Sequence, residues 1–134
     1  MCISHNLNMI KKLEEELNQL NVDFLFNSIF KLIEYNYPQF KWIFDFNKKV
    51  NNESASIMAI GVHKISKLIK PDIYIYIGLN IEKIKKGIKI ACNIHRGDKL
   101  IAYKEFSISK PTLEEMDGLS VEIFSWIKKN LQDL

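Results

Sequence analysis

The chain has 134 residues, of which 47% are hydrophobic and 26% are charged, and its formal net charge is +3. This length and composition predict one domain that can bury a core without disulfides or metal ions. The small positive charge is far from the concentrated basic surface of a dedicated nucleic-acid-binding protein, and no segment approaches the about 20 apolar residues of a membrane span.

The cysteines and the start of the chain indicate a compartment. Cys2 and Cys92 are the only two cysteines, too few for a disulfide framework, and they predict reduced thiols. Residues 1–6 do not combine a basic start with an apolar run, so we expect no signal peptide. Both observations favour a cytoplasmic protein.

Residues 1–36 are predicted to be helical, because apolar residues recur at spacings of three and four. The pattern resets near Asp23, which could cap a second helix, so one bent helix and a pair of helices both remain open. Pro38 ends the helical region. The apolar positions are Leu7, Ile10, Leu13, Leu17 and Leu20, followed by Leu25, Phe26, Ile29, Phe30, Leu32 and Ile33.

Residues 40–109 are predicted to form a sheet. The segment 40–47 alternates, with a row of aromatic residues that we expect to face the core: Phe40, Trp42, Phe44 and Phe46. The segment 54–62 is apolar at most positions and alternates less cleanly, which predicts a strand covered on both faces. Residues 63–70 either extend that strand or form an irregular connection.

The clearest strand lies between residues 72 and 82. Its odd-numbered positions are all aliphatic and its even-numbered positions are mostly polar or aromatic, as expected for a strand with one buried face and one solvated face. Five aliphatic side chains in one row need a cover, since exposure costs about 25 cal/mol per Å² of apolar surface. The helical segments are the expected cover.

Two more strands complete the predicted sheet. The first has its apolar row at Ile88, Ile90, Cys92 and Ile94, and the second spans residues 100–109. We expect a bulged turn around Gly97, because a two-residue turn would place Leu100 and Ala102 out of line with Ile90 and Cys92.

A final helix is predicted over residues 112–132, opened by a capping box of Thr112 and Glu115. The predicted fold is therefore α+β: a five-stranded antiparallel β-meander, with an N-terminal helix or helix pair and a C-terminal helix packed on one face. Residues 1–134 are expected to form this single domain.

No catalytic residue, metal site or cofactor site is predicted. Cys92 and His95 are three residues apart on a strand, so they point to opposite faces and cannot form a local thiol–imidazole pair. His5, His63 and His95 have no metal-ligand spacing. We therefore expect a protein that is not an enzyme, with Cys92 as an ordinary core residue.

The solvated face of the sheet is the best candidate for a binding surface. Tyr74 and Tyr76 lie on its central strand, and the neighbouring strand should add Lys89, Asn93 and His95, with Arg96 at the rim. Aromatic residues, histidine and arginine on a rigid sheet are typical of surfaces that bind proteins.

A small, single-domain α+β chain rich in lysine, asparagine and isoleucine and without a catalytic motif resembles the immunity proteins that bacteria encode beside contact-dependent or polymorphic toxins. The resemblance concerns architecture and composition. It implies one-to-one inhibition of a cognate toxin domain in the cytoplasm.

Two other functions remain open from the sequence. Tyr74 and Tyr76 could stack the bases of single-stranded nucleic acid while lysines contact its phosphates; the lysines concerned are Lys85, Lys86 and Lys89. Alternatively, a cavity between sheet and helices could hold a small ligand, as in a carrier or an enzyme. Its expected lining residues are Phe40, Trp42, Phe44 and Phe124.

Overall fold

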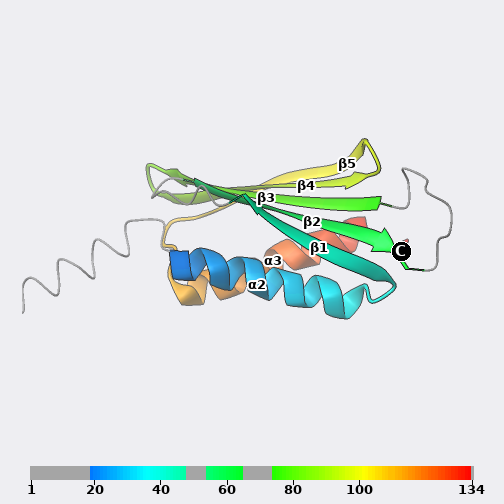
Figure 1. Ribbon diagram of the computed structural model, residues 1–134. Helices are drawn as coiled ribbons and strands as arrows, with labels where there is room; N and C mark the ends of the chain where they lie inside the picture. Colours follow the sequence, from blue (N-terminus) through cyan, green and yellow to red (C-terminus); the bar gives the residue numbers. More distant parts are fainter. Residues whose placement is uncertain (1–18, 48–53, 65–73, 134) are drawn as a thin grey trace, which may run out of the picture.

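The computed structural model describes residues 19–47, 54–64 and 74–133 of the chain (Figure 1). The predicted helical pattern of residues 7–18 lies outside the described residues, as do Cys2, His5 and residues 65–73, which include the start of the strand predicted between residues 72 and 82. The described elements, in chain order, are α2 (Gln19–Asn36), β1 (Phe40–Asn47), β2 (Ser54–His63), β3 (Tyr74–Ile84), β4 (Gly87–Arg96), β5 (Lys99–Ile108) and α3 (Leu113–Asn130).

The five strands form one antiparallel sheet in the order β1-β2-β3-β4-β5, so each strand pairs with its neighbours in sequence. The two helices pack on each other and lie on the same side of the sheet (Figure 1). We call the side that faces the helices the inner face and the other side the outer face. The predicted α+β meander is confirmed.

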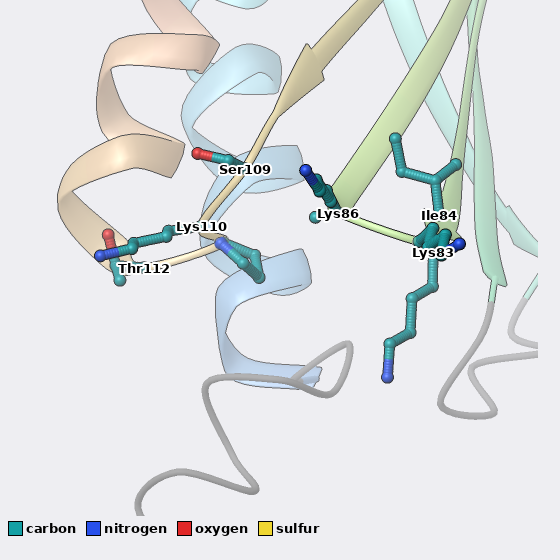
Figure 2. Close-up of a pocket in the computed structure, with 9 residues that line it drawn as sticks. Lys83, Ile84, Lys86, Ser109, Lys110 and Thr112 are labelled. Atoms are coloured by element: carbon teal, nitrogen blue, oxygen red, sulfur yellow. The ribbon is translucent and has the colours of Figure 1, made fainter.

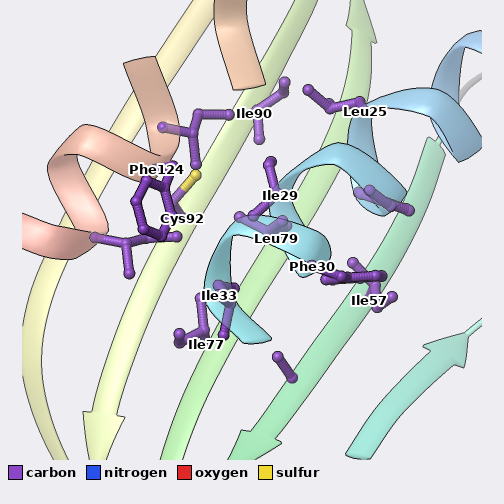
Figure 3. Packing of buried hydrophobic residues seen from close by; sticks show 14 of the residues in the cluster. Leu25, Ile29, Phe30, Ile33, Ile57, Ile77, Leu79, Ile90, Cys92 and Phe124 are labelled. Carbon is purple, nitrogen blue, oxygen red and sulfur yellow. The ribbon is translucent and has the colours of Figure 1, made fainter. Parts of the chain in front are cut away.

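The core lies between the inner face and the helices. Ile77 and Leu79 of β3 are buried there, facing Ile29 and Ile33 of α2 (Figure 3). The remaining inner-face positions of β3, Ile75 and Ile81, are buried as well. The strict alternation of β3 thus determines which face of the sheet is buried, because a shift in register by one residue would expose this row.

Helix α2 continues through Asp23 without interruption, so Asp23 does not cap a second helix. Its apolar stripe is long enough to keep the segment helical across this position, since helical stability in proteins comes mostly from tertiary packing. The stripe consists of Val22, Leu25, Phe26, Ile29, Phe30 and Ile33, all buried.

Strand β1 directs its aromatic residues to the inner face, as predicted for Phe40, Trp42 and Phe44. The Phe44 ring stacks on Phe30 of α2 with 4.1 Å between ring centroids. Trp42 lies over Gly61 of β2, where a Cβ atom would approach the indole ring to 2.6 Å. The glycine therefore makes room for the tryptophan, whose Nε1 donates a hydrogen bond to the Tyr37 carbonyl at 3.0 Å.

Strand β2 differs from its prediction. Its burial alternates along the strand, with Ala55, Ile57 and Ala59 buried, whereas Met58 on the outer face is 40% exposed. The expectation that both of its faces are covered is wrong for the described structure, because both described helices lie on the inner side. The apolar residues on its outer face are partly open to solvent.

The β4–β5 hairpin also differs from its prediction. Arg96 pairs with Lys99, so the turn is the two-residue Gly97–Asp98, and the register shift lies inside the ladder, between Ile94 and His95. Because β5 has one extra residue at this point, Ala102 and Phe106 lie on the inner face, whereas Leu100 lies opposite His95 on the outer face. The bulge was expected; its position was not.

Helix α3 begins as predicted. Thr112 is the N-cap, and its Oγ1 accepts a hydrogen bond from the Glu115 backbone N–H at 3.3 Å. The buried stripe of Met116, Leu119, Ile123 and Ile127 then packs on the sheet and on α2. Neither described helix combines the length and hydropathy that a membrane span requires.

Candidate functional site

The outer face carries a broad apolar surface that none of the described elements covers. Two rows of side chains cross all five strands in register, and we call their members, together with Val62 and Tyr74, the outer-face patch. The first row is Ile43, Ile60, Tyr76, His95 and Leu100, and the second is Asp45, Met58, Gly78, Asn93 and Tyr103.

Two tyrosines form the centre of the patch. The rings of Tyr74 and Tyr76 lie on the same face of β3, with centroids 6.3 Å apart and planes inclined by 23°. Tyr76 has Ile60 on one side and His95 on the other as direct cross-strand partners. Both rings are partly exposed. They combine large apolar area with hydroxyl groups that form no hydrogen bond to the residues that the structure describes.

The second row lacks a side chain at its central position, Gly78. Gly78 has no side chain, and the Asn93 side chain of β4 lies directly over it, 2.7 Å from where a Cβ atom would be. The Asn93 amide therefore lies flat on the sheet between Met58 and Tyr103. The result is a shallow surface with a polar group at its floor and apolar groups on both sides.

Exposed apolar residues extend the patch to both edges of the sheet. Ile43 on β1 is 51% exposed, and on β5 Leu100 is 53% and Tyr103 56% exposed. The Tyr103 hydroxyl donates a hydrogen bond to Glu105 at 2.7 Å, which raises the pKa of Tyr103 above its ordinary value. The patch thus combines exposed apolar side chains with polar groups, as protein-binding surfaces commonly do.

Sequence reasoning missed several members of the patch. Ile43 and Met58 stand on the polar-phase positions of their strands, and Leu100 was assigned to the core. An unbroken apolar stretch in β2 was the available signal, but coverage by a second layer would give the same pattern. Only the observed positions of the helices distinguish a buried second face from an exposed one.

Of the residues predicted for binding, Tyr74, Tyr76, Asn93 and His95 come together on the patch. Lys89 lies on the same face but toward the other end of β4, where its Nζ is 3.6 Å from Glu82. Lys89 therefore lies outside the outer-face patch and forms an ion pair with Glu82.

Arg96 does not join the other predicted residues. It pairs with Ile75, an inner-face residue of β3, and its guanidinium donates two hydrogen bonds to Asp133, at 2.8 and 3.0 Å. This interaction holds the pKa of the Asp133 carboxyl below its usual range. Arg96 therefore ties the end of the sheet to the chain beyond α3 instead of bordering the patch.

The described residues offer little for catalysis. Cys92 is a fully buried free thiol on the inner face, whereas His95 lies on the outer face, so the two do not form a pair. Burial raises the pKa of Cys92 to about 12, which keeps the thiol protonated. No group of three or more metal-ligating side chains occurs among the residues that the structure describes.

The two other functions left open by the sequence gain no support from the geometry. Tyr76 and Lys85 are nine residues apart along β3 and its turn, about 30 Å in an extended chain, so the tyrosines and the terminal lysines do not form one surface. The aromatic residues expected around a ligand pack on the core: Phe40 and Phe124 are buried, and Phe44 stacks on Phe30.

In comparisons with known proteins, no protein family, no curated protein sequence and no solved structure matches this chain. Its function must therefore be argued from its own residues.

Proposed function

We propose that this protein is a non-catalytic protein-binding module that holds its partner on the outer-face patch. The observation that supports this proposal is the mainly apolar row of side chains that crosses all five strands, with Tyr76 in it and Tyr74 beside it on β3. Isolated exposed apolar residues are common, but a contiguous patch with a polar rim marks an interaction site.

The outer face as a whole is large enough for such a role. Five strands spaced about 4.8 Å apart, with a length of about ten residues, give a whole face on the order of 800 Å², of which the outer-face patch is one part. That is about the area that each partner contributes to a protein–protein interface of standard size. The five strands are also hydrogen-bonded into one sheet, and a surface pre-organised in this way lowers the entropy cost of binding.

The partner that we propose is a cognate bacterial toxin domain, which the protein would neutralise in the cytoplasm by one-to-one binding. The support for this choice is the resemblance of composition and architecture to immunity proteins. A pre-organised sheet surface is suited to blocking another protein's site by covering it.

The first test isolates the partner and asks whether the protein neutralises it. The tagged protein is first used to isolate its partner from the cells that encode it, and the partner domain is then expressed alone and together with the protein. We expect growth arrest by the partner alone and rescue by co-expression, with a one-to-one complex by light scattering.

Replacing both Tyr74 and Tyr76 with alanine should weaken binding by more than about 2 kcal/mol, because central aromatic residues dominate interface energies. Tyr35→Ala is the control, since Tyr35 is 85% exposed on α2, on the opposite side of the molecule. Binding titrations and the rescue assay should separate the two variants. Equal binding by both would contradict the patch as the interface, and a partner that is harmless alone would contradict the toxin.

A further inference from the structure

A second surface feature lies far from Tyr74 and Tyr76, at the opposite end of β3. The β3–β4 turn and the β5–α3 connection enclose a hollow of about 620 Å³ (Figure 2). Its charged lining residues are Lys83, Lys85, Lys86 and Lys110.

The hollow is strongly positive. Four of its lining residues are lysines, contributed by both segments, and none is acidic. In the part of the chain that the structure describes, none of these four ammonium groups forms an ion pair, whereas nearby Lys89 is paired with Glu82. An anion in the hollow would therefore be stabilised by the positive charges of the two segments that line it.

Both walls of the hollow are fixed by packing. Gly87 has φ = 100°, and a Cβ atom there would lie 1.9 Å from the Ile108 carbonyl oxygen, so the turn is held tightly against the end of β5. On the other side, the Asn21 side chain of α2 donates a hydrogen bond to the Pro111 carbonyl. The lysines are therefore mounted on two braced segments of the fold.

The walls also offer neutral groups to a ligand. Ser109 and Thr112 carry hydroxyls, and Ile84 and Pro111 provide apolar contact area. Glu114 and Glu115 follow in the first turn of α3, but both are exposed and neither lines the hollow. Lysine ammonium groups with hydroxyl donors are common ligands of phosphate groups.

We propose that this hollow binds a small molecule that carries two or more adjacent phosphate groups. Four lysines match the charge of a di- or triphosphate better than that of a single phosphate, and the volume lies within the about 300–1,000 Å³ of small-molecule sites. This site is separate from the outer-face patch, so it adds a ligand to the protein whether or not the proposed partner is correct.

The test is calorimetric titration of the full chain at low ionic strength with inorganic tripolyphosphate and, separately, with inorganic phosphate. We expect tripolyphosphate to bind at least about tenfold more tightly, because more charge is neutralised. The double variant Lys86→Gln with Lys110→Gln should lose at least about tenfold in affinity, since each substitution removes one ammonium group from the hollow.

The control is the double variant Lys31→Gln with Lys99→Gln. Both of its lysines are exposed and lie outside the hollow, and the net charge changes by the same amount. It should keep its affinity within about twofold. Circular dichroism checks that both variants are folded.

Any of three results of these titrations would overturn the proposal: no binding of tripolyphosphate by the unaltered chain, an equal loss in both double variants, or equal affinity for tripolyphosphate and phosphate. The proposal would also be overturned if a single-stranded oligonucleotide binds more tightly than tripolyphosphate and the Lys86 and Lys110 double variant loses this binding. The hollow would then bind a nucleic-acid backbone.

Discussion

Cys92 shows how burial controls the chemistry of a single residue. Its side chain lies in the core among apolar residues of β3, β4 and α3, with Phe124 beside it (Figure 3), and this environment disfavours the thiolate. The pKa of the thiol is raised from 9.0 to about 12. A residue that a motif search would consider as a nucleophile is therefore an inert part of the core.

The raised pKa predicts a dependence of stability on pH. Since the folded state holds the proton more tightly than the unfolded state, the contribution to the free energy of unfolding is complete below pH 9 and is lost as pH rises from 9 toward 12. Between pH 8 and 10 the loss should be about 1 kcal/mol.

Urea titrations at several pH values measure this loss. Cys92→Ala will be less stable at every pH because of the cavity it creates, but its stability should fall less steeply over this range. Parallel profiles for the two proteins would show that other groups cause the alkaline loss.

The conformation of the β3–β4 hairpin depends on the glycine at position 87. Gly87 has a positive φ, and its backbone lies against the end of β5, so a side chain there meets both strain and a steric clash. We expect Gly87→Ala to lower the free energy of unfolding by about 2 kcal/mol or more.

Gly118 provides the opposite case within α3. It is exposed, and a Cβ atom at this position would have no neighbour within 4 Å. Gly118→Ala should therefore raise the free energy of unfolding by up to about 1 kcal/mol, since alanine loses less backbone entropy in a helix. Chemical denaturation of the two variants should give effects of opposite sign, and a stabilised Gly87→Ala would show that the turn can relax.

At the scale of the whole molecule, the two faces of the sheet should respond differently to the same substitution. Ile77 is buried on the inner face, and Ile43 is half exposed on the outer face. Ile77→Ala should cost about 2–5 kcal/mol of stability through lost burial and a cavity, whereas Ile43→Ala should cost less than about 1 kcal/mol.

Equilibrium unfolding gives both values, and partner binding gives the complementary result. Ile43→Ala should weaken the complex while leaving the fold stable. A large loss of stability in Ile43→Ala would indicate that the outer face is covered in the native protein and is not a free binding surface.

Some positions of the predicted site residues could be derived from the sequence and others could not, depending on whether their neighbours in the fold are also close in sequence. Tyr74, Tyr76, Asn93 and His95 could be placed on one face because alternation within a strand and pairing of adjacent strands are local rules. Arg96 could not, since its partner Asp133 lies 37 residues away in sequence and follows the last helix.

The sequence by itself determined the elements and the buried face of the sheet. Four alternating aliphatic positions of β3 permit only one orientation toward the core, and Thr112 with Glu115 fixes the start of α3. Only the tertiary structure decided where the bulge in the last hairpin lies, which apolar residues of β2 stay exposed, and that four lysines enclose one hollow. The reason is physical: periodicity records how a side chain points relative to its own strand, whereas exposure and charge clustering depend on segments that meet only after the chain has folded.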